Sequence, residues 1–156
     1  ILPILHGGGH EFEYRSGTLA VHNIVGFGMA ALIAKKRMEI DNKNIKKITR
    51  ALLNGLKKIF PNLIVNGGMK HRLEGNLNIT FPKHSAEKIM MSITEIACST
   101  GSACTSSIPK PSHVLMALGL NKEQINNTIR FGIGKFNNLK EIEFVLNLFK
   151  NRLKEK

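Results

Sequence analysis

The 156-residue sequence contains no tryptophan, a single tyrosine and only two cysteines, Cys98 and Cys104. Without tryptophan, a stacking platform for nucleic-acid bases would have to be built from phenylalanine. Two cysteines in a chain of this length form no disulfide framework, which favours a reducing cytoplasm as the location. No apolar run approaches the roughly 18 residues of a membrane span, and residues 1–10 lack the features of a signal peptide.

Acidic residues are also scarce, with 11 Asp and Glu against 23 Lys and Arg and a formal net charge of +12. This balance is compatible with a nucleic acid or an acidic protein as a partner. The lysines are scattered rather than clustered, so nucleic-acid binding is not expected to be the main role. A content of 42% hydrophobic and 22% charged residues is typical of a soluble globular protein of one domain or slightly more.

Hydrophobic periodicity and capping residues predict a chain of mixed helix and strand. A strand is expected over residues 1–5, followed by a glycine-rich loop. Two helices are expected next, the first over residues 21–40 and the second from Asp41 or Asn42 to about Phe60. The remaining expected strands cover residues 62–66, 77–81, 96–99 and 128–134, and the remaining helices cover residues 86–95, 111–120 and 138–153. Ser85 is expected to cap the helix that follows it, and the residues from Asn121 and from Asn138 have capping-box spacing. This order predicts an α/β or α+β fold with a small mixed sheet and helices packed on it.

Cys104 lies in the segment 99–107, STGSACTSS, where every neighbour is Ser, Thr, Gly or Ala. Such neighbours leave a sulfur uncovered, and a thiolate is the reactive form of cysteine. Cys104 is therefore either a nucleophile or sulfur carrier, or a small residue that fills a tight turn.

Two further positions have both a functional and a plain structural interpretation. Arg130 lies in a predicted strand whose other face is apolar, so it is either a guanidinium fork for a carboxylate or a charge that blunts a sheet edge. The segment 15–18, RSGT, precedes a predicted helix, where hydroxyls either contact a phosphate or cap the helix. His6 and His10 lack the spacing of a metal site.

Three segments in this order resemble the C-terminal portion of cysteine desulfurases of the IscS/NifS type: residues 6–18, HGGGHEFEYRSGT; residues 99–120, STGSACTSSIPKPSHVLMALGL; and residues 129–136, IRFGIGKF. These enzymes are class V aminotransferase-like, fold-type I pyridoxal phosphate enzymes. The resemblance implies that residues 1–20 are the remnant of a large cofactor domain. It also implies that residues 21–40 are a linking helix and that residues 41–156 are a small domain with a mobile cysteine loop.

The resemblance also implies the reaction and its residues. Cysteine desulfurases convert L-cysteine to L-alanine and leave a persulfide on the enzyme, here on Cys104. The persulfide is delivered to an iron–sulfur scaffold or to another acceptor, such as a tRNA-thiolation partner, and Cys104 would be a transient ligand of an iron–sulfur cluster through it. Arg130 matches the arginine that holds the substrate carboxylate. Thr18 matches the threonine that contacts the phosphate of pyridoxal phosphate in the other subunit of a homodimer.

One residue of the family pattern is missing. The lysine that forms the Schiff base with pyridoxal phosphate lies upstream of the glycine-rich stretch in these enzymes, so we expect this chain to be part of a longer enzyme and inactive alone. Cys98 is an additional thiol, expected to be a small buried strand residue. Two other functions stay open: a catalytically inactive module for dimerisation and acceptor docking, and a basic nucleic-acid-binding domain.

Overall fold

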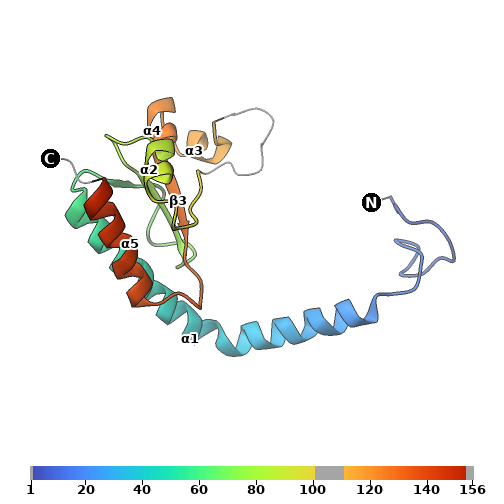
Figure 1. The fold of residues 1–156 in the computed structure, drawn as a ribbon. Coiled ribbons are helices and arrows are strands. Elements are labelled where there is room, and N and C mark those ends of the chain that lie inside the picture. Colours follow the sequence, from blue (N-terminus) through green and yellow to red (C-terminus); the bar gives the residue numbers. More distant parts are fainter. Residues whose placement is uncertain (1, 101–110, 154–156) are drawn as a thin grey trace. The chain divides into compact units, whose positions relative to one another are not determined.

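The computed structural model of the chain describes residues 2–100 and 111–153 (Figure 1). The chain divides into two compact units, Ile1–Met38 and Glu39–Lys156. Helix α1, Val21–Ile59, begins in the first unit and ends in the second. Within the described ranges, no helix is both long enough and apolar enough to cross a membrane.

Helix α1 is a single helix of 39 residues, so the prediction of two helices separated at Asp41 is wrong. Asp and Asn are favourable N-caps only where the backbone leaves the helical conformation. Between Met29 and Asn54 the sequence contains no glycine or proline. Within a helix, Asp41 and Asn42 are each less favourable than alanine by less than about 1 kcal/mol, and neighbouring residues of high helix propensity offset this. The helix therefore continues through this point.

The N-terminal unit also differs from expectation, because the described residues 2–5 form no strand. A strand needs a neighbouring strand for its N–H and C=O groups, and the sheet of the described residues does not include this segment. The carbonyl oxygen of Leu5 instead accepts a hydrogen bond of 3.0 Å from the backbone N–H of Ser16. The side chains of Leu2 and Ile4 are 88% and 91% exposed.

The second unit is built on a three-stranded antiparallel sheet in the order β1-β2-β3. The strands are β1, Ile64–Val65; β2, Asn76–Thr80; and β3, Thr128–Gly132. Register places Leu77 opposite Phe131 and Ile79 opposite Ile129, so these apolar side chains share one face. The predicted fold, a small sheet with packed helices, is confirmed, although every strand pair in the described part is antiparallel.

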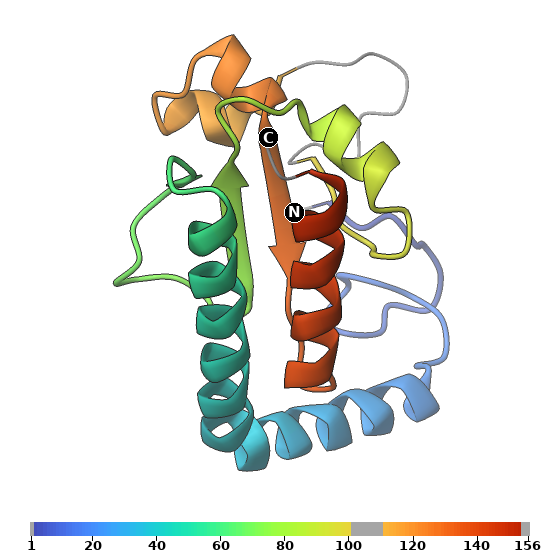
Figure 2. The same cartoon turned by 60° about the vertical axis from the view of Figure 1, so that its left-hand side comes forward.

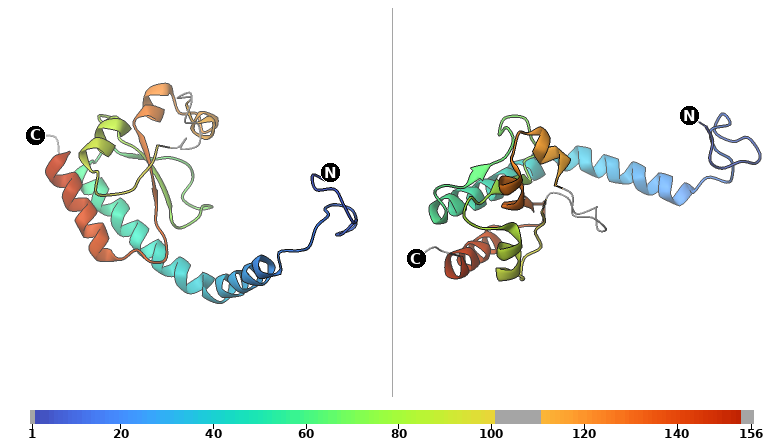
Figure 3. Two further views of the ribbon diagram at one scale, coloured as in Figure 1. Left: turned by 45° about the vertical axis from the view of Figure 1, so that its right-hand side comes forward. Right: turned by 90° about the horizontal axis from the view of Figure 1, so that it is seen from above.

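Among the described residues of this unit, four shorter helices follow: α2, Ala86–Ser92; α3, His113–Ala117; α4, Lys122–Asn126; and α5, Leu139–Arg152. Ser85 caps α2, and Asn121 and Asn138 form capping boxes at α4 and α5, as the sequence predicts. Figure 3 shows α3 and α4 at the end of the sheet where β3 begins. The strand expected over residues 96–99 is reduced to one bridge between Ser99 and Arg130.

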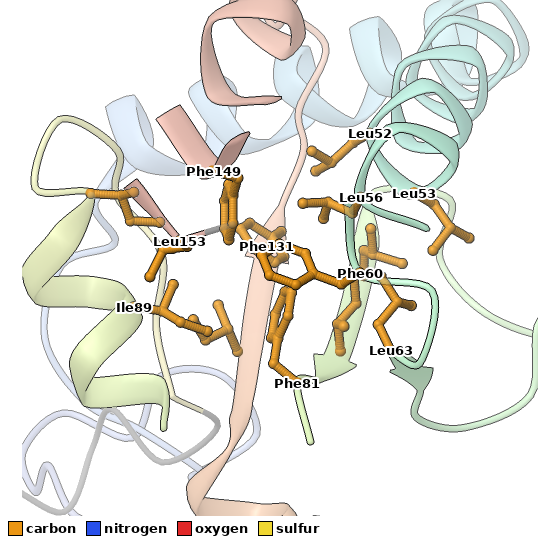
Figure 4. Close-up of a cluster of buried hydrophobic side chains, with 14 of the residues drawn as sticks. Leu52, Leu53, Leu56, Phe60, Leu63, Phe81, Ile89, Phe131, Phe149 and Leu153 are labelled. Carbon is orange, nitrogen blue, oxygen red and sulfur yellow. The ribbon is translucent and has the colours of Figure 1, made fainter. Parts of the chain in front are cut away.

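The core lies between the apolar face of the sheet and two helices, the C-terminal part of α1 and α5, which lie side by side (Figure 2). Phe149 of α5 is fully buried at its centre (Figure 4). Its ring centroid lies 6.0 Å from that of Phe60, 5.9 Å from that of Phe81 and 6.2 Å from that of Phe131. This core fixes the sheet, and the opposite face of the sheet carries the polar side chains described below.

Two glycines in this unit stand where a side chain would collide with a neighbour. A Cβ on Gly75 would overlap the backbone oxygen of Ile133, whose N–H donates a hydrogen bond of 2.8 Å to the Gly75 oxygen. The nearest atoms that a Cβ on Gly55 of α1 would overlap belong to the side chain of Leu146 on α5. Backbone atoms in a hydrogen-bonded pair cannot move aside, whereas a leucine side chain can change its rotamer.

Gly75→Ala is therefore expected to lower the free energy of unfolding by about 1–3 kcal/mol. Gly55→Ala should cost less, because alanine also gains about 1 kcal/mol of helix propensity over glycine. Urea unfolding of both variants measures the difference. A Gly75→Ala variant as stable as the parent, or more stable than Gly55→Ala, would show that the Ile133 carbonyl does not constrain this position.

Candidate active site

Arg130 lies in the middle of β3, on the face of the sheet opposite the core. Its neighbours in the strand, Ile129 and Phe131, are 0% and 6% exposed, whereas Arg130 is exposed, as the strand pattern predicts. Among the described residues, its guanidinium makes no hydrogen bond or ion pair. The five N–H donors of this group are therefore available to a ligand.

The backbone of Arg130 argues against the interpretation of this residue as a charge that blunts a free sheet edge. Its N–H donates to the oxygen of Ser99 at 2.7 Å, and its oxygen accepts from the Ser99 N–H at 3.2 Å. Both backbone groups are thus paired on the outer side of β3. An edge charge serves to repel a further strand, and this position is already covered.

Arg130 lines a pocket on the polar face of the sheet. Its polar lining comes from the strands, from the loop after β1 and from the start of α3, and includes Asn66, Arg72, Asn76, Asn78, Ser112 and Arg130. No aspartate or glutamate contributes to the described lining. A pocket with two arginines and no acid favours an anionic ligand.

The described residues on both sides of the Cys104 segment belong to the Arg130 site. Cys104 and residues 101–110 lie outside the described residues. On the N-terminal side, Ser99 is bonded to the backbone of Arg130. On the C-terminal side, Ser112 is the N-cap of α3 and lines the pocket itself. The fold therefore ties both flanks of the cysteine segment to the Arg130 site.

A buried hydrogen-bond network lies beside Arg130 on the same face. Asn66, Thr80 and Thr128 are 6%, 1% and 0% exposed. Asn66 Nδ2 lies 2.7 Å from Asn78 Oδ1 and 2.9 Å from Thr80 Oγ1. The Thr80 and Thr128 hydroxyl oxygens are 2.7 Å apart. Asn78 in turn lies directly opposite Arg130 in the register of β2 and β3.

Nothing in the sequence singles out these asparagines and threonines as site residues. The available signal was the alternation of polar side chains in residues 76–80, NLNIT, which also marks an ordinary solvent-facing strand. The network joins residues 14, 48 and 62 positions apart. Only the register of the sheet brings them together.

Thr18 lies in the N-terminal unit, three residues before α1 begins at Val21. Its side chain is exposed. The preceding Gly17 has a φ of 91°, a left-handed conformation that glycine adopts without strain. The hydroxyl of Ser16 is buried and accepts a hydrogen bond of 3.3 Å from the Gly9 N–H. The turn therefore leaves the Thr18 side chain at the surface, and the hydrogen bond between Ser16 and Gly9 stabilises the preceding loop.

Cys98 is a free thiol that is half-buried against the core. Burial raises the pKa of the Cys98 thiol above its usual range, because the thiolate would lose its hydration. Less thiolate at neutral pH makes Cys98 a poor nucleophile. The sequence prediction of a small buried residue is met in part, although Cys98 lies beside a single bridge and not inside a strand.

Within the described residues, no group of three or more His, Cys, Asp or Glu side chains could hold a metal ion. His6 and His10 therefore belong to no such group. The prediction that Cys104 is a transient iron–sulfur ligand falls on a residue outside the described part of the chain.

Residues 7–145 match the aminotransferase class-V family. The chain belongs to this family. It is 48% identical over 152 residues to cysteine desulfurase IscS of Haemophilus influenzae (strain PittEE), covering 97% of this chain and 37% of that protein. It is 50% identical over 142 residues to cysteine desulfurase IscS of Shewanella sp. (strain ANA-3), covering 91% of this chain and 35% of that protein. The chain thus spans little more than a third of these relatives.

Solved structures show the same similarity. A NifS-like protein from Rickettsia africae matches with a TM-score of 0.79 and 30% identity over 95% of this chain and 39% of that one. The protein SspA, solved in complex with cysteine, matches with a TM-score of 0.56 and 26% identity over 88% of this chain and 37% of that one. The predicted resemblance to cysteine desulfurases of the IscS/NifS type is confirmed.

Proposed function

We propose that this protein is a cysteine desulfurase, which removes sulfur from L-cysteine to give L-alanine and a persulfide on Cys104. The observation that carries the proposal is the pocket with two arginines and no acid at Arg130, with both flanks of the Cys104 segment tied to it. A carboxylate binds such donors, and a thiol must reach the same substrate. The complex of the related SspA with cysteine supports cysteine as the ligand class.

In this proposal each residue has a separate task. The guanidinium of Arg130 binds the carboxylate of cysteine and orients the molecule. The thiolate of Cys104 attacks the substrate sulfur, so that an S–S bond forms and the C–S bond breaks. The electron pair of that bond stays on carbon, which takes up a proton to give L-alanine. The persulfide on Cys104 is then passed to an acceptor protein, an iron–sulfur scaffold or another thiolation partner.

The family uses pyridoxal phosphate, and the residues of this chain fit one end of it. Thr18 has an exposed hydroxyl next to a glycine in a left-handed turn, which suits contact with a phosphate. We propose that Thr18 contacts the phosphate of the cofactor in a homodimer. The bound cofactor would withdraw electrons from the substrate carbon and so weaken its bond to sulfur. We propose that the lysine that holds the cofactor lies outside these 156 residues, so this chain alone should not turn over cysteine.

Incubation of the full-length protein with L-cysteine, followed by mass spectrometry under non-reducing conditions, tests the proposal. Cys104 should gain the mass of one sulfur atom, and Cys98 should not, because burial raises the pKa of its thiol. No Lys or Arg lies between the two cysteines, so trypsin leaves both in one peptide and fragment ions must locate the added sulfur. Sulfur on Cys98 alone, or on neither cysteine, would contradict the proposal.

A further inference from the structure

The direction of each hydrogen bond in the buried network follows from a single carbonyl group. The backbone oxygen of Gln124 can only accept, so the hydroxyl of Thr128, 2.6 Å away, donates to it. The single proton of Thr128 is then used. In the contact of 2.7 Å between the two hydroxyls, Thr80 must therefore donate to Thr128.

This order determines the orientation of Asn66. With its proton donated to Thr128, Thr80 must accept in its 2.9 Å contact with Asn66 Nδ2. Asn66 Oδ1 also lies 3.1 Å from the Thr80 hydroxyl, which has no second proton to give, so this contact alone does not distinguish the two ends of the amide. The end that also faces Thr128 Oγ1, at 3.4 Å, must donate, because the proton of Thr128 is used on Gln124; that end is Nδ2. One N–H of the Asn66 amide thus serves Thr80, and the other is available to Asn78 Oδ1 at 2.7 Å.

The orientation of the Asn66 amide also determines the orientation of the Asn78 amide. Its carbonyl oxygen faces Asn66, so its NH₂ group is the part left for the pocket that Asn78 and Arg130 both line. Asn78 stands directly opposite Arg130 across β2 and β3, and opposite residues in an antiparallel pair have Cβ atoms about 4.5–5.5 Å apart. The guanidinium and the amide therefore present N–H donors to the same pocket.

We propose that Asn78 is a second contact for the substrate carboxylate beside Arg130, and that Asn66 is the positioning residue that makes Asn78 present its NH₂ group. This inference rests on the proposed function, in which the pocket binds the carboxylate of cysteine. A carboxylate accepts hydrogen bonds and donates none. The charged guanidinium and the NH₂ group of Asn78 together should bind a carboxylate more tightly than an uncharged amide or ester. This requires that Asn78 present its NH₂ group and not its oxygen to the pocket.

The first test is an NMR titration of the full 156-residue chain with L-alanine and, separately, with L-alaninamide. L-Alanine carries the same carboxylate as cysteine and does not react. The side-chain NH₂ signals of Asn78 and the Nε–H signal of Arg130 should shift with L-alanine and stay in place with L-alaninamide. Equal shifts with both compounds, or a shift of Arg130 without Asn78, would overturn the inference.

The second test compares KM and kcat for L-cysteine in the full-length protein. Asn78→Asp keeps the size of the side chain but replaces the donor by a carboxylate, so KM should rise by about tenfold or more. Asn78→Ala, which adds no charge, should raise KM by a smaller factor, and kcat should change less than KM in both variants. An unchanged KM in a folded Asn78→Ala variant would overturn the inference.

A double-mutant cycle separates a positioning role of Asn66 from a structural one. Asn66→Ala should raise KM in the parent and have little further effect when Asn78 is already alanine. Equal effects in both backgrounds would overturn the positioning role. If Arg130→Ala also leaves KM unchanged, the carboxylate pocket of the proposed function fails. If Arg130→Ala raises KM and neither asparagine does, only the inference fails.

Discussion

Cys104→Ser in the full-length protein is expected to abolish persulfide formation and alanine production while cysteine still binds. A serine hydroxyl is not ionised near neutral pH and cannot accept the transferred sulfur as a persulfide, so turnover should fall to background. Arg130 is unchanged in this variant, so its proposed contact with the substrate carboxylate should remain. Alanine release measures turnover, and the absorption change of the bound cofactor on addition of cysteine measures binding.

Cys98→Ser is the matched control for this experiment. Cys98 is half-buried, and the raised pKa of its thiol leaves little thiolate. Its replacement should therefore leave turnover near the parent value, apart from a small loss of stability. Full activity in Cys104→Ser would show that Cys104 does not accept the sulfur, and complete loss in Cys98→Ser would indicate that Cys98 does.

The fold was predictable wherever local pattern and packing agree. Alternation in residues 77–81 and 128–134 placed β2 and β3 because one face of each strand is buried. Capping boxes at Asn121 and Asn138 placed two helix starts, because these hydrogen bonds join residues three apart. The break expected at Asp41 was wrong because residues that can cap a helix also occur within one.

For the candidate site, the sequence predicts only the residues that carry chemistry by themselves, and the role of each stays a prediction. Arg130 and Cys104 stand out because each residue type is unusual in its setting. Asn66 and Asn78 do not, since polar side chains alternate along any solvent-facing strand and asparagine is common in turns. Their proposed roles depend on a series of hydrogen bonds that ends on the Gln124 oxygen. Sequence spacing does not reveal the direction of those hydrogen bonds.

Arg130→Ala is expected to weaken the binding of L-cysteine by about ten- to a hundredfold. The variant removes a charge-assisted hydrogen-bonding group worth roughly 1.5–3 kcal/mol, and about 1.4 kcal/mol corresponds to a factor of ten in affinity. Because Arg130 is exposed and its side chain makes no hydrogen bond or ion pair among the described residues, the free energy of unfolding should change by less than about 0.5 kcal/mol. Titration with L-cysteine and urea unfolding measure the two quantities.

Two variants make the Arg130 result specific. Arg130→Lys keeps the charge but loses the planar fork, so its affinity should fall between those of the parent and Arg130→Ala. Arg50→Ala removes an exposed arginine of α1 that does not line the pocket, and it should bind cysteine like the parent. Equal losses in Arg50→Ala and Arg130→Ala would indicate a general effect of net charge, because removing any one of the 23 basic residues lowers the charge of +12 by the same amount. An unchanged affinity in Arg130→Ala would show that Arg130 is a surface charge and does not bind the substrate. The proposed function would then rest on Cys104 and the family resemblance.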